Sequence, residues 1–114
     1  MVVKLNRAAL TRARKLVKEG QVVRDQRDDW SEHAPTAAEE NKFIEAHGWD
    51  AYAAWHLGVD TEKPVETKGR YSFPFDDFAK VHRCAVISLE SRAAQNDHED
   101  ITTSSKNLLE LIDS

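Results

Sequence analysis

The first thirty residues carry a strong helical pattern. On a helical wheel of about 100° per residue, one arc of about 140° is aliphatic, with Leu5, Ala9, Leu10, Ala13, Leu16 and Val17. The opposite arc of about 100° is basic, with Lys4, Arg7, Arg14, Lys15 and Lys18. Because Asn6 can cap the start and Gly20 can end it, the pattern predicts a basic amphipathic helix over residues 5–19. Residues 21–31 either extend that helix or form a linker.

Two short helices are predicted in the middle of the chain. Thr36 and Glu39 have the spacing of a capping box, in which each residue satisfies an amide of the other's turn. This first helix runs to about His47, and Gly48 supplies its left-handed C-terminal residue. A second helix is expected over residues 49–57, ending at Gly58. The two helices would form a corner hinged at glycine.

The segment between residues 58 and 75 is polar at first and aromatic at its end. Residues 58–70 indicate a loop. Residues 71–75 alternate aromatic and small side chains, and Pro74 disfavours a helical conformation at Phe73. Because no partner strand is evident, we expect a short extended lead-in and not a sheet.

The last third predicts a helical hairpin. A long helix is expected from about Asp77 to Gln95, capped by Asp76 or Asp77. A final helix, with Asp97 and Asp100 as a capping pair, runs to about Ile112. The connecting turn is short, which favours antiparallel packing. The prediction for residues 1–114 is therefore one all-α domain of about five helices, in effect a small helical bundle.

Two stretches in this region resemble a known family. Residues 71–84 are YSFPFDDFAKVHRC and residues 90–95 are ESRAAQ. They resemble a family of short bacterial proteins, some in phage-like or plasmid-like settings, with a Phe-Pro-x-x-Asp-Phe-x-x-Val-His-Arg segment leading into Glu-Ser-Arg-Ala. The resemblance extends more loosely over residues 30–58. It implies a bacterial, intracellular, all-helical protein and supplies no catalytic residues, because that family has no assigned activity.

Composition excludes several classes of protein. Of 114 residues, 40% are hydrophobic, yet no apolar run approaches the 18–20 residues or so that span a bilayer. Residues 1–19 lack the apolar stretch of a secretory signal, so a cytoplasmic protein without a membrane partner is expected. Cys84 is the sole cysteine, which excludes an intramolecular disulfide and a four-cysteine zinc cluster.

The net charge of −4 conceals an uneven distribution. Residues 1–30 contain eight basic and four acidic residues, so they net +4, and the remaining residues net −8. Three interpretations of the basic helix stay open: binding of nucleic-acid phosphates, docking on an acidic protein surface of this chain or a second subunit, or simple solvation of its basic face. The acidic remainder would repel a phosphate backbone, which favours a protein contact. Residues 1–30 could also be exchanged between two subunits.

The histidines and the cysteine do not predict a metal or cofactor site. The five histidines (His33, His47, His56, His82 and His98) show no i, i+3 or i+4 spacing. On a helix, His82 and Cys84 would point about 160° apart. Cys84 has no general base three or four positions away, so a small buried side chain is its expected role. The aromatic residues, all between Trp30 and Phe78, are expected to form much of the core.

A polar group on the long helix suggests a ligand site. His82 lies in the apolar stripe of that helix, with Arg83 and Arg92 nearby. Either His82 and Arg92 are core-edge groups paired with carboxylates such as Asp50, Asp76 or Glu90, or a pocket for an anion is lined by His82, Arg83 and Arg92.

The sequence thus favours a non-enzymatic, self-associating interaction module, in the form of a homodimer. The alternatives are a nucleic-acid accessory protein that uses the basic helix, and a ligand binder or enzyme around His82.

Overall fold

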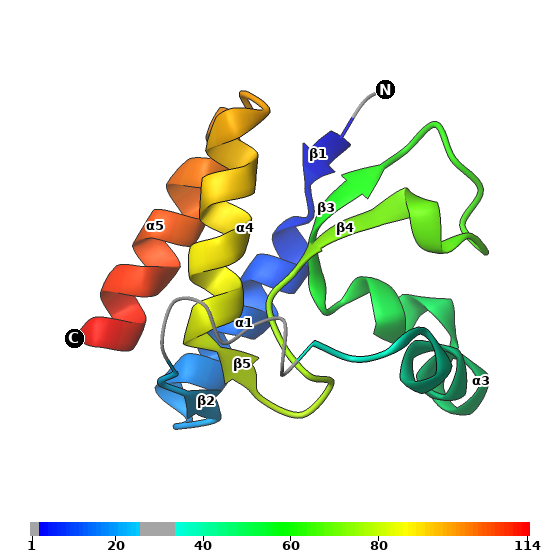
Figure 1. Ribbon diagram of the computed structural model, residues 1–114, viewed down its shortest axis with the longest axis horizontal. Helices are drawn as coiled ribbons and strands as arrows, with labels where there is room; N and C mark the ends of the chain where they lie inside the picture. Colours follow the sequence, from blue (N-terminus) through cyan, green and yellow to red (C-terminus); the bar gives the residue numbers. More distant parts are fainter. Residues whose placement is uncertain (1–2, 26–33) are drawn as a thin grey trace.

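The computed structural model describes residues 3–25 and 34–114, and it has an α+β fold (Figure 1). The helices of this part are α1 (Arg7–Lys18), α3 (Ala37–Ala53), α4 (Arg83–Gln95), α5 (Glu99–Asp113) and the 3-10 turn η1 (Lys68–Arg70). The strands are β1 (Val3–Leu5), β2 (Val22–Val23), β3 (His56–Asp60), β4 (Tyr71–Pro74) and β5 (Val81–His82). The prediction of an all-α helical bundle is therefore wrong. Residues 26–31 of the predicted linker, which include Trp30, and also His33 lie outside the described residues.

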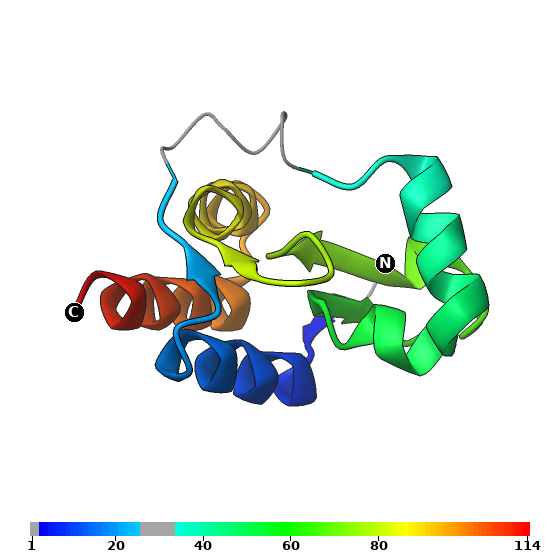
Figure 2. The same ribbon diagram turned by 90° about the horizontal axis from the view of Figure 1, so that it is seen from below.

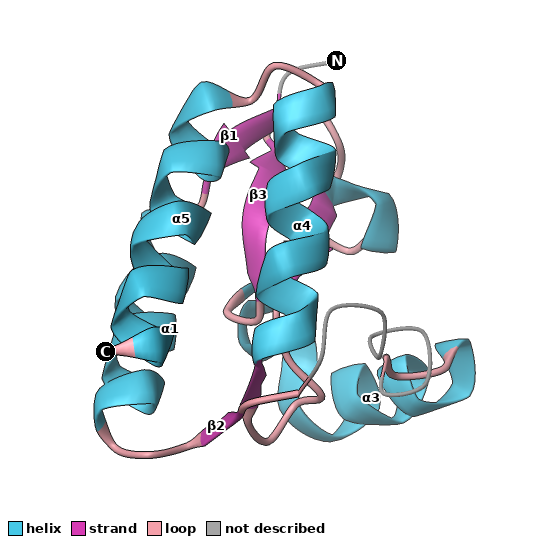
Figure 3. Cartoon of the chain, turned by 60° about the vertical axis from the view of Figure 1, so that its left-hand side comes forward, coloured by secondary structure: helices cyan, strands magenta, loops and turns pink. Residues whose placement is uncertain are grey.

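Two sheets organise the chain. The larger has the order β1-β3-β4 and is antiparallel, with Lys4 opposite Val59 and Gly58 opposite Ser72. The smaller pairs β2 with β5 in parallel. Around the larger sheet, α1 contacts β3, α4 contacts β4 and α5 contacts β1. Figure 2 shows α5 between α1 and α4, and Figure 3 shows β3 behind the α4–α5 pair. The predicted C-terminal hairpin of α4 and α5 is present.

Local capping signals are confirmed where they depend only on neighbouring residues. Asn6 caps α1 by accepting a hydrogen bond from the Ala9 amide, and Gly20 follows the helix with a φ of 80°. In α3, Thr36 and Glu39 exchange both hydrogen bonds of the capping box, each 3.2 Å long. Gly48 kinks α3 with a φ of 85°, a conformation that glycine adopts at little cost. The predicted glycine hinge is therefore confirmed.

The predicted helix over residues 49–57 continues only to Ala53, and β3 begins three residues later. Gly58 does not end a helix. It lies in the middle of β3, where a Cβ atom would come within 2.5 Å of Ser72 Oγ and 2.7 Å of the Phe73 ring. Glycine fits here because the side chains of Ser72 and Phe73 on the paired strand β4 occupy the space of a Cβ atom. Residues 71–74, predicted as an unpaired lead-in, are the partner of β3.

The long C-terminal helix begins six residues later than predicted. Asp76 and Asp77 accept hydrogen bonds from amides two or three residues on, as expected of capping side chains, but they shape a tight turn. Phe78 takes a φ of 67° in this turn, and β5 follows before α4 starts at Arg83. At the α4–α5 turn, Asp97 has a φ of 58° and His98 precedes α5, so the predicted Asp97–Asp100 capping pair is not formed.

The core lies between the larger sheet and the three helices packed on it. The buried residues of α5 include Ile101, Ser105, Leu108 and Ile112, and those of α4 include Ala85, Val86, Leu89 and Ala93. Cys84 is also buried, which confirms the expected role of a small buried side chain. Several aromatic residues contribute as expected: Tyr52, Trp55, Tyr71, Phe73 and Phe75. Aliphatic residues of α1 complete this core. Among the described helices, none has the length and apolar character needed to cross a bilayer.

Candidate functional site

The smaller sheet brings a polar cluster together at the start of α4. β2 and β5 run in parallel with Val23 opposite His82, so Asp25, two residues after Val23, lies beside the first turn of α4. Asp77 reaches the same place from the turn before β5. Four residues separated by up to 59 positions thus meet in space: Asp25, Asp77, His82 and Cys84. We call this set the His82 cluster.

His82 bridges two carboxylates. Its Nδ1 lies 2.7 Å from Asp25 Oδ2, and its Nε2 lies 2.9 Å from Asp77 Oδ2. The side chains of His82 and Asp25 are only 4% and 7% exposed, whereas that of Asp77 is 36% exposed. A ring that donates from both nitrogens is an imidazolium, and the two facing carboxylates stabilise its positive charge.

The pKa values of the cluster reflect this arrangement. Burial lowers the pKa of His82, but the hydrogen bonds to Asp77 and Asp25 outweigh it and leave that pKa raised. Burial raises the pKa values of Asp25 and Asp77, but their hydrogen bonds with His82 and with backbone amides leave both lowered. The ionised forms of His82, Asp25 and Asp77 therefore stabilise one another.

Asp25 also caps α4 from a distant part of the chain. Its Oδ1 accepts a 2.7 Å hydrogen bond from the Cys84 amide, whereas the N-cap residue His82 makes no side-chain cap. A carboxylate at this end of a helix also interacts favourably with the helix dipole. Asp25 thus couples the N-terminal third of the chain to the C-terminal hairpin.

Carboxylate partners for His82 are one of the two alternatives from the sequence, but the sequence does not predict that they are Asp25 and Asp77, because the helix expected over residues 77–95 includes His82. In the structure its backbone is extended, with φ −104° and ψ 123°, so the helical angle between His82 and Cys84 does not apply. Donor atoms of Asp25, His82 and Cys84 lie within 4.8 Å of one another. The one available signal was the β-branched pair Val22-Val23 ahead of an aspartate. As for catalysis, both ring nitrogens of His82 face carboxylates, so the ring has no nitrogen left to activate the Cys84 thiol.

The predicted anion pocket is not assembled. His82 is enclosed between Asp25 and Asp77. Arg83 forms a two-point ion pair with Asp113 at the end of α5, with distances of 2.8 and 3.2 Å. Arg92 is exposed in the last turn of α4, about 14 Å along the helix from Arg83. The three side chains therefore do not converge on one cavity.

The basic face of α1 is exposed, as the sequence predicts. Its aliphatic side, with Ala9, Leu10, Ala13 and Val17, is buried against the rest of the molecule. The predicted cations are all exposed, although Lys4 belongs to β1 and not to the helix (Lys4, Arg7, Arg14, Lys15 and Lys18). Within residues 3–25 and 34–114, none of these five forms an ion pair. A concavity of about 370 Å³ on this face is lined by Thr11, Arg14, Lys15, Lys18 and Glu19. We call the four helical cations, Arg7, Arg14, Lys15 and Lys18, the basic face.

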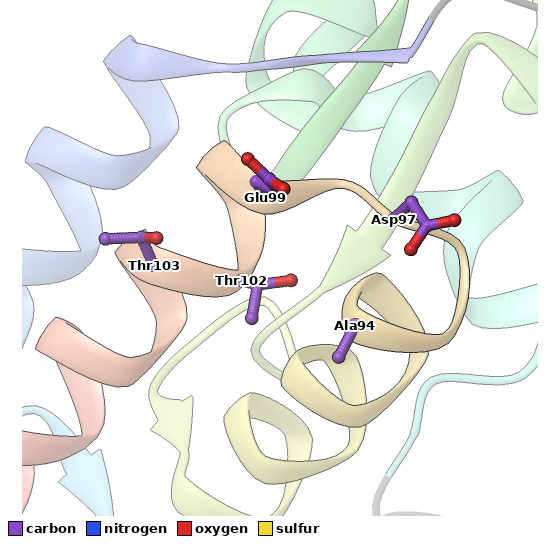
Figure 4. A pocket seen from close by; sticks show the side chains of 5 residues that line it. All are labelled: Ala94, Asp97, Glu99, Thr102 and Thr103. Carbon is purple, nitrogen blue, oxygen red and sulfur yellow. The ribbon is translucent and has the colours of Figure 1, made fainter.

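A second concavity, of about 300 Å³, lies at the turn between α4 and α5 (Figure 4). The two acidic side chains shown, Asp97 and Glu99, come from the turn and from the first residue of α5. Ala94 comes from α4, and Thr102 and Thr103 come from α5. Apart from its two acidic side chains, nothing about this concavity indicates a ligand in the described part of the chain.

Comparison with known proteins identifies no relative. No protein-family model, curated protein or solved structure matches the chain. The resemblance of residues 71–95 to a bacterial family therefore stays a prediction.

Proposed function

We propose that this protein is a non-enzymatic cytoplasmic interaction module whose basic face binds an acidic protein surface, in the first instance that of a second copy. The observation that carries the proposal is that the two faces of α1 differ in burial and in charge. One face of the helix is buried in the core of its own chain. The other face exposes cations that have no carboxylate partner among the described residues.

The charge of the neighbouring helix supports self-association. Helix α1 contains five basic and no acidic residues, a net charge of +5, whereas α5 contains four acidic residues and one lysine, a net charge of −3. The two helices lie side by side (Figure 2). In a two-fold dimer, the basic face of one subunit can therefore meet α5 of the other twice over, because a two-fold interface repeats each contact.

The test is the oligomeric state of the purified chain, measured by sedimentation at several salt concentrations. We expect a dimer at about 50 mM and 150 mM salt that weakens above these values, since salt screens exposed charges. Arg14→Gln/Lys15→Gln/Lys18→Gln should shift the protein toward monomer. Lys42→Gln/Lys63→Gln/Lys80→Gln, which removes the same charge from exposed sites elsewhere, is the matched control and should leave the dimer unchanged.

The proposal would be contradicted if the protein sediments as a single monomeric species at high protein concentration. It would also be contradicted if the two triple variants change the oligomeric state equally. The same exposed cations favour one alternative, a nucleic-acid accessory role. That role predicts retention on a phosphate-bearing resin at about 50 mM salt, a steep loss as salt rises, and loss of retention in the first triple variant only. A monomer that behaves in this way would replace the first proposal by the second.

A further inference from the structure

The His82 cluster contains the donor atoms of a transition-metal site. Asp25 supplies a carboxylate oxygen, His82 an imidazole nitrogen and Cys84 a sulfur atom, and all of these atoms lie within 4.8 Å of one another. We propose that Asp25, His82 and Cys84 bind a divalent transition metal of the zinc type, with Asp77 as an outer-sphere partner. A mixed sulfur, nitrogen and oxygen donor set selects Zn²⁺ or Co²⁺ over Mg²⁺ and Ca²⁺, which prefer oxygen ligands.

A tetrahedral site requires the donors, which lie at most 4.8 Å apart, to shift by roughly 1 Å. Bond lengths of about 2.0–2.3 Å place neighbouring donors roughly 3.3–3.8 Å apart. The shortest separation, 2.7 Å between Asp25 Oδ2 and His82 Nδ1, is a hydrogen bond that must open by about 1 Å or less. The fourth position would be taken by water or another donor.

The surroundings of the donors match those of established metal sites. A histidine that binds a metal through one nitrogen usually donates the other N–H to a carboxylate, which fixes the ring. Asp77 Oδ2 lies 2.9 Å from His82 Nε2 and occupies that position. The Cys84 amide, 2.7 Å from Asp25 Oδ1, holds the carboxylate ligand in the same manner. Both outer contacts can persist when the metal takes the place of the inner hydrogen bond.

The exchange leaves the net charge of the cluster unchanged. Without metal, the two carboxylates and the imidazolium sum to −1, with Cys84 counted as a neutral thiol. Binding of Zn²⁺ displaces one proton from His82 Nδ1 and one from Cys84 Sγ, because the ligands are a neutral imidazole and a thiolate. The metal-bound cluster therefore also sums to −1. The buried site gains a metal without gaining a net charge.

The metal would cross-link parts of the chain that are distant in sequence. Asp25 follows β2, whereas His82 and Cys84 lie 57 and 59 residues further on, at the junction of β5 and α4. An ion bound by all three would stabilise the smaller sheet and the start of α4, and a ligand that binds only the folded state raises its stability.

The experiment is a Co²⁺ titration of the full chain after removal of metal with a chelator. Cys84 is the sole cysteine, so a thiolate-to-Co²⁺ charge-transfer band in the near ultraviolet reports on this site alone. We expect the band to saturate at one equivalent and to disappear when Zn²⁺ is added. Cys84→Ser should abolish the band and His82→Asn should remove it or weaken it strongly, whereas His47→Asn, at an exposed histidine outside the cluster, should leave it intact.

Asp77→Asn keeps all three ligands and tests the outer sphere. We expect its Co²⁺ affinity to fall by about 10–100-fold with the band retained. If the ligand variants fail to fold, X-ray absorption of the zinc-loaded native chain decides the matter, since one sulfur at about 2.3 Å is required. Absence of the band, metal binding without a sulfur neighbour, or a band that persists in Cys84→Ser would each overturn the proposal and leave the cluster as a purely structural ion-pair network.

Discussion

Asp76 is a fully buried carboxyl group in the turn after β4, only 1% exposed. Its Oδ2 accepts the Phe78 amide, while its Oδ1 has no hydrogen-bond partner in the described structure. Burial raises the pKa of Asp76 well above its ordinary value; the Phe78 hydrogen bond and the nearby Arg12 guanidinium only partly oppose this. Because a raised pKa means that the folded state prefers the protonated acid, the stabilising contribution of Asp76 is complete below about pH 4 and is lost as the pH rises through the folded-state pKa.

We therefore expect Asp76→Asn to stabilise the protein at pH 7, by on the order of 1 kcal/mol, because Asn keeps the acceptor for Phe78 and cannot ionise. The measurement is urea unfolding of both proteins at pH 4 and pH 7. The gain should shrink at pH 4. A variant less stable than the native chain at pH 7 would show that the Asp76 charge is favourable.

His56 is a second buried titratable side chain. Its pKa is lowered, whereas that of Asp76 is raised, so its contribution to stability depends on pH in the opposite direction. Burial lowers the pKa of His56 to about 4, despite the 2.8 Å hydrogen bond from its Nδ1 to the Tyr52 carbonyl. With a folded-state pKa below the unfolded value of 6.5, the contribution of His56 is present above about pH 6.5 and is lost progressively down to about pH 4.

His56→Asn should remove this pH dependence, since the Asn amide can still donate to the Tyr52 carbonyl and does not titrate. Between pH 7 and pH 4, the native chain should lose up to about 3 kcal/mol more stability than the variant. Unfolding free energies of both proteins at several pH values measure the difference, in which all other titrating groups cancel. Parallel pH profiles for the two proteins would contradict a neutral His56.

At the scale of elements, the pairing of β3 and β4 depends on one glycine. Gly58→Ala should destabilise the protein by about 1–3 kcal/mol, because the new Cβ would come within 2.5 Å of Ser72 Oγ and 2.7 Å of the Phe73 ring, and these packed side chains must shift. Gly69→Ala is the control: its nearest neighbour would be the flexible end of Lys63, 3.5 Å away, so little change is expected. Thermal unfolding of both variants tests this prediction, which fails if the two shifts are alike.

The elements also show why some predictions held and others failed. The start of α3 was predictable because Thr36 and Glu39 satisfy each other within one turn. The start of α4 was not, because its cap is Asp25, which is 58 residues before Arg83 in the sequence. Similarly, β3 and β4 are short, and each is recognisable as a strand only beside the other.

At the scale of the whole molecule, residues 3–25 are integral to the fold. β1 pairs with β3, β2 pairs with β5, and α1 contributes four buried side chains to the core. We expect a fragment of residues 34–114 to show no cooperative unfolding transition, since it would lack two strands and one helix of a single core. Circular dichroism of the fragment tests this, and added peptide 1–33 should restore the transition. A fragment that unfolds cooperatively by itself would show that residues 1–33 are an appendage.

What the sequence alone determined is the set of features governed by near neighbours: the amphipathic face of α1, the capping box of α3, the kink at Gly48 and the α4–α5 hairpin. The tertiary structure alone decided the fold class and the His82 cluster. The physical reason is the same for both. A strand pair and a buried ion pair are stabilised by partners far along the chain, and the free energy that favours them has no counterpart in the local pattern of hydrophobic and polar residues.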